Sequence, residues 1–166
     1  MKAFQISDIK LFMKNLLILE TFDAFRVSEF SVTTSVTYTI DGALHPEFYD
    51  EETRNTLLDS ETYTSWQSIK TFCLSIIKGK QTPLNFKIVF LLSQENLSQL
   101  LADNHIAMNT DDIFGLYLNC QYENQSLMCV TGTSLRLFSL DKTLDNVWDS
   151  SVITFLKKHE LPYEEV

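Results

Sequence analysis

Glycine and proline are scarce in this chain, with four Gly and three Pro in 166 residues. A nucleotide-binding loop needs glycines so that the backbone can approach the phosphates, and no such loop is present. The G-x-S-x-G and H-E-x-x-H patterns of hydrolases and metalloproteases are missing as well. We therefore expect a protein that is not an enzyme and has no cofactor.

Histidine and cysteine are also few, at three residues each. The cysteines are odd in number, lack C-x-x-C spacing and lie among apolar residues, which favours buried free thiols in a reducing compartment. No histidine has a second His or Cys at metal-ligand spacing, so we expect no metal site. These residues are Cys73, Cys120 and Cys129, and His45, His105 and His159.

The chain has no block of positive charge. Its net charge is −9, and its lysines are dispersed in pairs such as Lys10 with Lys14 and Lys78 with Lys80. A nucleic-acid partner is possible but not favoured, because phosphate binding needs a basic face. Neither a signal peptide nor an apolar run of about 20 residues is present, so we expect a cytoplasmic protein without membrane contact.

What the chain does contain suits one ordered domain over residues 1–166. Hydrophobic residues make up 45% of it, and twelve are phenylalanine. In the first half, 1–84, we expect a strand at 2–6, a helix capped by Ser7 or Asp8, and strands within 30–40 that end in an Asp41-Gly42 turn. Leu16 to Leu19 are apolar all round, which predicts cover on more than one side.

Residues 45–64 are acidic and poor in apolar side chains, which indicates a surface insertion with about one helical turn. The next stretch, 66–77, fits either structure: Trp66, Ile69 and Cys73 have helical spacing, whereas Phe72, Leu74 and Ile76 alternate as in a strand. We favour the strand, because a hairpin through Lys78-Gly79-Lys80 would lead directly into the strong strand at 86–92.

The second half, 85–166, repeats the order of the first. After the strand at 86–92, Ser93 caps a helix that ends near Asn104, and three strands follow around 116–118, 127–129 and 135–137. Asp149 or Ser150 is expected to cap a C-terminal helix, and the tail 163–166 to fray. The predicted fold class is α+β: pseudo-duplicated β-α-β-β-β units forming a largely antiparallel sheet, two packed helices and a C-terminal helix.

This doubled order resembles a single domain of the DNA sliding clamps. Tyr117-Leu118-Asn119 resembles their Tyr-Leu-Asn on the first strand after the helix, and Val130, Arg136 and Leu137 match their Val-Ala-Thr-Asp-Gly-His-Arg-Leu segment, although its Asp-Gly-His core is absent. The resemblance spans residues 86–140 and implies a clamp-like fold. Clamps encircle DNA with basic helices, whereas the first helix here offers only Lys10 and Lys14.

Over its whole length the chain also resembles a small uncharacterised bacterial protein family. The resemblance is carried by Glu20-Thr21-Phe22-Asp23, Thr39-Ile40-Asp41-Gly42 and Ile77 to Pro83. No activity comes with that family.

We expect a non-catalytic interaction or scaffolding protein that binds a protein partner. Its candidate interaction surface is Lys78, Lys80 and Asp41 on turns, with Lys10 and Lys14 on the first helix, because binding residues often lie on loops of a rigid scaffold. The lysines would contact an acidic partner. Two alternatives stay open: a DNA-associated relative of the sliding clamps, and a small thiol enzyme that uses Cys73 with His45.

Overall fold

The fold is built on one sheet in which every paired strand is antiparallel. A computed structural model describes residues 1–57 and 61–166. The strand order is β3-β2-β5-β6-β7-β1-β8, and β4 pairs with β2. The strands are β1 (Ala3–Ile6), β2 (Arg26–Thr33), β3 (Thr37–Asp41), β4 (Thr64–Ser65), β5 (Asn85–Leu91), β6 (Ile113–Glu123), β7 (Ser126–Leu135) and β8 (Tyr163–Glu165).

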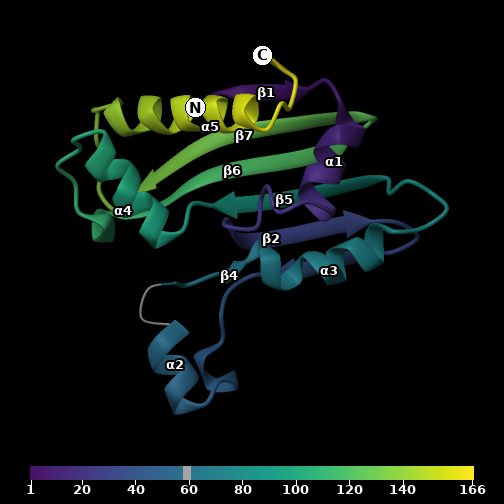
Figure 1. Cartoon of the computed structure of the whole chain (residues 1–166), viewed down its shortest axis with the longest axis horizontal. Helices are drawn as coiled ribbons and strands as arrows, with labels where there is room; N and C mark the ends of the chain where they lie inside the picture. The colour runs from purple at the N-terminus through teal and green to yellow at the C-terminus, as the bar shows by residue number, and fades with distance from the viewer. Residues whose placement is uncertain (58–60) are drawn as a thin grey trace.

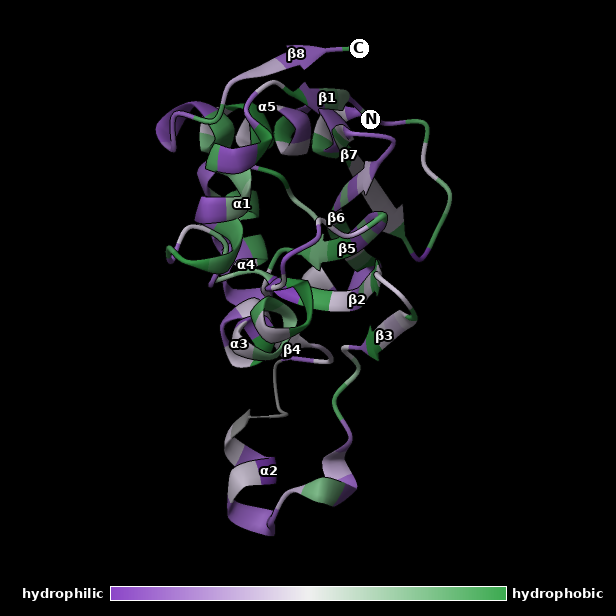
Figure 2. Cartoon of the chain, turned by 90° about the vertical axis from the view of Figure 1, so that its right-hand side faces the viewer, coloured by the Kyte–Doolittle hydropathy of each residue, from purple (hydrophilic) through white to green (hydrophobic). Residues whose placement is uncertain are grey.

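Four helices cover one face of this sheet, and a fifth lies apart from it (Figures 1 and 2). The covering helices are α1 (Ile9–Leu17), α3 (Trp66–Ile77), α4 (Gln94–Asp103) and α5 (Thr143–Lys158); α2 (Glu51–Leu57) belongs to the insertion. Short 3-10 turns occupy Pro46–Phe48 and Thr110–Asp112. Among the described residues, no helix is both long enough and apolar enough to span a membrane.

Alternation along the strands explains why only one face is covered. Phe30, Ile88, Leu118 and Cys129 are fully buried or nearly so and share the core with residues from all four covering helices. Their strand neighbours on the opposite face are mostly only partly buried, as in β7, where buried and half-buried positions alternate from Leu127 to Thr131. Period-two patterning of this kind leaves the second face of an antiparallel sheet to solvent.

Several predicted elements are confirmed. The first strand, the strands within 30–40, the strand before Ser93 and the helix after it are all present. Asp8 rather than Ser7 caps α1, since its carboxylate accepts from the Leu11 backbone N–H at 2.9 Å. Ser93 caps α4 by accepting from Asn96 N–H, and the insertion is a surface segment with one short helix over its described residues.

The strand predicted for residues 66–77 is wrong, because this stretch is helix α3. Ser65 caps it by accepting from Ser68 N–H at 3.3 Å, and the helix buries Trp66 and Cys73 while leaving Phe72 69% exposed. The indole Nε1–H of Trp66 donates to Leu16 O at 2.7 Å in the core. Burial of this indole favours the helix over the strand. The spacing of apolar residues within 66–77 cannot reveal such packing, because that spacing fits both structures.

The C-terminal region departs from expectation in three ways. A separate strand at 135–137 is wrong, since β7 runs through Leu135 and Leu137 lies exposed beyond it. The last helix starts at Thr143, so Asp149 lies buried in its middle and caps nothing. The tail does not fray, because β8 adds to the sheet beside β1 with Gln5 opposite Glu164.

Two details of the first half differ from expectation. Of the apolar stretch 16–19 only Leu16 and Leu17 are buried, whereas Ile18 and Leu19, which follow α1, are exposed. Gly42 does not make a turn. The chain continues past β2 here, and the backbone N–H of Gly42 donates to Ser28 O at 3.0 Å. A Cβ atom on Gly42 would lie 1.7 Å from Val27 O. Glycine is needed there for close backbone approach.

The expected duplication appears in the order of elements but not in their places in the sheet. Both halves begin strand, helix, strand, strand. In the second half β5 lies beside β6, whereas in the first half β7, β6 and β5 stand between β1 and β2. The helix α1 therefore crosses most of the sheet, while α4 joins two neighbouring strands.

Replacing Trp66 tests the core contact between α3 and α1. We expect Trp66→Phe to lower the free energy of unfolding by about 1–3 kcal/mol, since Leu16 O would lose a buried donor. Trp66→Ala should cost about 3–5 kcal/mol through the added cavity. Urea unfolding followed by circular dichroism measures both. Equal stability of Trp66→Phe and the parent chain would contradict this account.

Candidate binding cleft

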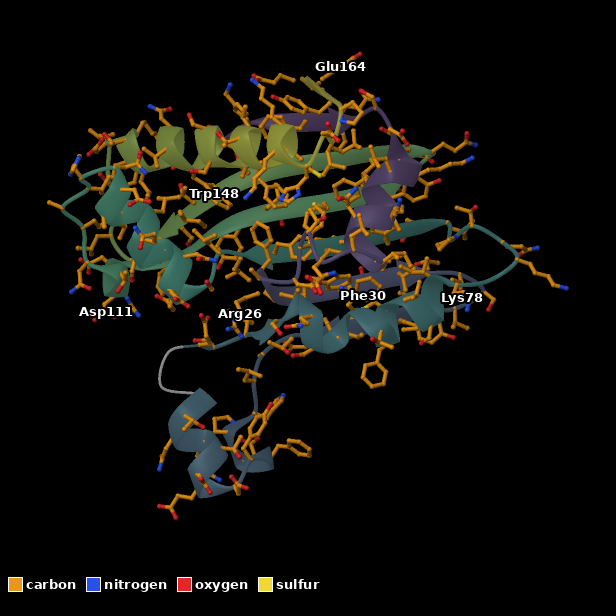
Figure 3. The ribbon with its side chains drawn as sticks, viewed as in Figure 1. Arg26, Phe30, Lys78, Asp111, Trp148 and Glu164 are labelled. Atoms are coloured by element: carbon orange, nitrogen blue, oxygen red, sulfur yellow. The ribbon has the colours of Figure 1, made fainter. Side chains whose placement is uncertain are left out.

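A large open cleft of about 1350 Å³ lies at one end of the sheet. It lies where β5 and β7 finish and β2 and β6 begin, next to the first turns of α3 and α4. Figure 3 shows Arg26 and Asp111 toward this end of the molecule and Lys78 at the other. The cleft is lined mainly by hydroxyl, amide and charged side chains.

Arg26 and Glu61 occupy the junction between β2 and α4. Arg26 Nε lies 3.6 Å from Glu61 Oε1, and this nitrogen is sealed from solvent without a hydrogen-bond acceptor. Glu61 Oε1 instead accepts the backbone N–H of Gln94 at 2.9 Å, at the first residue of α4. A carboxylate is favoured at a helix N-terminus, so Glu61 is held by α4 and leaves the arginine nitrogen unsatisfied.

A second arginine flanks the outer wall of the cleft. Arg136 Nε–H donates to Asp111 O, and its guanidinium carbon stands 4.8 Å from the centre of the Phe114 ring. Burial, together with the nearby Tyr63 hydroxyl, raises the pKa of Tyr117 in the same cleft. At neutral pH its phenol is therefore a neutral donor and acceptor of hydrogen bonds.

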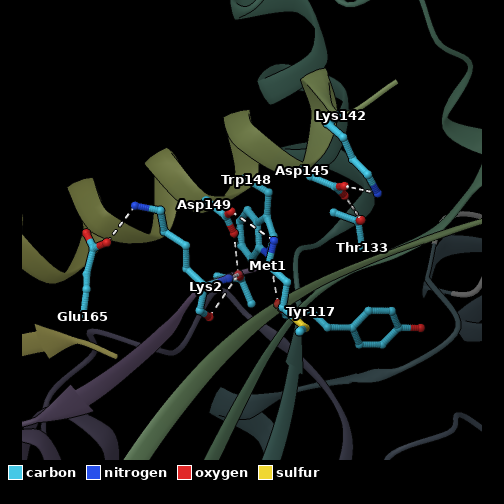
Figure 4. Close-up of polar contacts among 10 residues, drawn as sticks. Met1, Lys2, Tyr117, Thr133, Lys142, Asp145, Trp148, Asp149 and Glu165 are labelled. Carbon is cyan, nitrogen blue, oxygen red and sulfur yellow. Dashed lines mark hydrogen bonds and ion pairs between the residues drawn. The ribbon is translucent and has the colours of Figure 1, made fainter. Parts of the chain in front are cut away.

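The backbone of Tyr117 is held from the helix side of the sheet (Figure 4). Trp148 of α5 donates its Nε1–H to Tyr117 O at 2.8 Å. The same part of α5 is tied to β7 by hydrogen bonds from Thr131 to Asp149 and from Thr133 to Asp145. These contacts make the β6–β7 wall of the cleft part of the rigid core.

The lining residues equip the cleft for hydrogen bonding more than for bond breaking. They include serines that cap α3 and α4, Ser65 and Ser93, and they include no histidine or cysteine. Over residues 1–57 and 61–166 no group of three or more His, Cys, Asp or Glu side chains could hold a metal ion. The arrangement can bind a polar ligand that carries hydrogen-bond donors and a carboxylate.

The candidate residues from the sequence lie outside the cleft and are not brought into one site. Lys10 and Lys14 are exposed on α1, Lys78 and Lys80 are exposed on the loop after α3, and Asp41 ends β3. Sequence reasoning missed Arg26. The only signal was an isolated arginine among apolar residues, and nothing in the sequence places it beside Glu61, 35 positions away.

The thiol arrangement is not formed. Cys73 is fully buried in α3, and burial raises the pKa of its thiol to about 12. His45 is exposed at the start of the insertion, where its Nδ1 lies 3.4 Å from Glu47. Cys120 and Cys129 face each other across β6 and β7 with their sulfurs 3.2 Å apart, buried and free. Burial of the three thiols matches the sequence expectation.

A family model covers residues 15–164. The chain belongs to DUF5721, a family of unknown function. The expected relation to an uncharacterised family is thereby confirmed. Searches of the curated proteins and of the solved structures found no match. The resemblance to the sliding clamps thus gains no support from the comparisons, and the cleft of this DUF5721 chain has to be interpreted from its own geometry.

The buried thiols make a chemical prediction. At neutral pH a thiol-reactive probe should label no cysteine of the folded DUF5721 chain, because the reactive thiolate is disfavoured and the sulfurs are covered. In denaturant the same probe should label all three cysteines. Intact-mass spectrometry counts the labels. Rapid labelling of Cys73 in the folded chain would revive the thiol-enzyme alternative.

Proposed function

We propose that this chain is a non-catalytic, cytoplasmic interaction protein, and that its cleft takes a carboxylate-bearing segment of a protein partner. The observation that carries the proposal is Arg26 Nε, a sealed donor without an acceptor on the wall of a large polar cleft. An unsatisfied buried donor costs about 1–3 kcal/mol. Because Nε itself is sealed, a ligand in the cleft would meet the partly exposed remainder of this guanidinium, whose charge Glu61 neutralises only at 3.6 Å.

The rest of the cleft fits a carboxylate at this point. Arginine recognises carboxylates through two parallel N–H donors, which Lys cannot reproduce. Glu61 shows that a carboxylate is accepted here, because it lies between Arg26 and the first N–H of α4. A partner carboxylate would join this group, while the serines and Tyr117 supply hydrogen bonds to the neighbouring peptide.

The cytoplasmic part of the proposal is supported by the cysteines. Cys120 and Cys129 lie opposite each other with their sulfurs 3.2 Å apart and are nevertheless both free thiols. Adjacent free thiols of this kind suit a reducing compartment, since an oxidising one would favour their disulfide.

Capture from a native lysate tests the binding function. The immobilised chain should retain a protein, and Arg26→Gln should reduce the amount retained by about tenfold. Arg26→Lys keeps the charge without the two-pronged donor and should recover only part of the binding. Lys157→Gln, which removes one exposed charge at the end of α5, is the matched control. Equal capture by Arg26→Gln and the parent chain would refute the role of the cleft.

A DNA-associated relative of the sliding clamps is the second candidate. Lys10 and Lys14 support it, since both are exposed one turn apart on α1. The repeated order of strand, helix, strand, strand is the other supporting feature. Against it stand the different sheet positions of the two halves and α4, which has no basic residue.

DNA binding makes its own prediction. Retention on a DNA column at low salt that is lost in the Lys10→Glu/Lys14→Glu variant would support the candidate, because neutralised phosphates release counterions and make binding salt-dependent. The Lys157→Glu/Lys158→Glu variant carries the same change of charge on another helix. Absence of retention at any salt concentration would remove DNA association from consideration.

A further inference from the structure

Within residues 1–57 and 61–166 the sheet ends at β3, and this edge has hydrogen-bonding groups without a partner strand. Gly42 N–H donates toward β2 at Ser28 O, and Leu84 N–H reaches Thr33 O from the β5 side. Because backbone groups alternate along an antiparallel strand, Tyr38 and Ile40 pair with β2, whereas the N–H and C=O groups of Thr37, Thr39 and Asp41 point away from it.

An uncovered edge of this composition favours strand addition. β3 reads Thr-Tyr-Thr-Ile-Asp, with one charge, β-branched residues at three of its five positions and no proline. Most of it is exposed, including Tyr38 at 42%. Natural proteins protect exposed edges with charge, proline or cover, and the described residues of β3 carry little of these.

The insertion continues outward from this same edge. We call its described residues 45–57 the acidic arm. Figure 2 shows the arm beyond β3 and β4, and Figure 1 shows it beyond β4, in the direction in which the strands stack. Arg54 bonds to the carbonyls of Pro46 and Tyr49, which lie within the arm itself. Phe48 is 84% exposed beside a hollow lined by Ile40, Leu44 and Ile69.

The two ends of β3 carry opposite charges. The arm follows the Asp41 end and contains Glu47, Asp50, Glu51 and Glu52 against the single Arg54. The other end, at Thr37, lies at the same end of the sheet as the loop after α3, since Leu84 of that loop bonds across β2 to Thr33, the partner of Thr37. That loop carries Lys78 and Lys80, which are exposed and make no ion pair within the described residues.

We propose that two copies of this chain pair edge to edge through antiparallel β3 strands, with the acidic arm of each copy against Lys78 and Lys80 of the other. A two-fold axis at Thr39 pairs all five residues of the strand. It places Tyr38 opposite Ile40 on one face, and Thr37 opposite Asp41 on the other, with no like charges facing each other. The same axis brings the acidic end of one copy to the basic end of its partner.

These features favour a second copy of this chain as the partner at the β3 edge. A C2 interface must be complementary to itself, and here the surface that supplies the acidic arm also supplies the lysines that match it. The net charge of −9 would otherwise oppose association of two identical chains. The arm and the lysines replace that repulsion by local attraction at both ends of the shared strand. The proposal does not depend on the cleft.

Sedimentation velocity of the purified full chain over a range of concentrations tests the proposal. The parent chain should form a dimer that weakens with salt. Lys78→Glu/Lys80→Glu and Glu51→Lys/Glu52→Lys should each weaken the dimer by about tenfold or more, whereas the variant with all four changes should regain most of the affinity, because opposite charges face each other again. Lys157→Glu/Lys158→Glu is the charge-matched control and should leave the dimer unchanged.

A backbone substitution tests the strand pairing separately. Thr39→Pro removes an outward N–H that β2 does not use, so the fold should persist by circular dichroism while the dimer is lost. A monomer at every concentration of the parent chain would overturn the proposal. So would a Thr39→Pro variant that is folded and dimerises as the parent does, or failure of the four-residue charge swap to restore what each pair of changes removes.

Discussion

The contact between Trp66 and the end of α1 is the interaction on which the helical layer depends. The indole is fully buried, packs against Phe30 and Phe90 of the sheet, and donates to Leu16 O. One side chain thus joins α3, α1 and the sheet. Burying a polar N–H is tolerated only with a partner, and the last turn of a helix offers free carbonyls. Lys70 adds to the same junction by bonding to Leu19 O and Asp23.

This layer determines where binding can occur. Because four helices are packed on one face, many of the aromatic side chains are buried in the core, and the surfaces left for recognition include the open face, the ends of the strands and the sheet edge at β3. The cleft uses strand ends and the first turns of two helices, so its groups are anchored in the rigid core. The edge presents backbone groups that no neighbouring strand among the described residues satisfies. The two surfaces therefore offer different interactions: charge and hydrogen bonding of side chains at the cleft, and strand pairing at the edge.

Sequence patterns predicted the elements whose signals are local. Asp8 and Ser93 are caps that act within three residues, and both act as expected. The α+β class, the antiparallel sheet and the exposed acidic insertion also follow from local alternation and composition. The errors fall where distant contacts decide. Residues 66–77 fit both periodicities until Trp66 is placed in the core, and the tail is ordered only because β1 offers it an edge. Asp149 is of a residue type that often caps helices, but here it is buried and accepts a hydrogen bond from Thr131.

The candidate sites show the same division. Lys78 and Lys80 are candidates that the sequence can indicate, because charged residues on a loop are visible there, whereas Arg26 and Glu61 meet only after β2 and α4 have been brought together. By itself the sequence determined the fold class, the burial of the cysteines and membership in DUF5721, since these depend on composition and local order. The tertiary structure alone decided the strand order, the cleft and the open edge at β3. These arise from which surfaces remain uncovered once the core is packed, and that is a property of the whole chain.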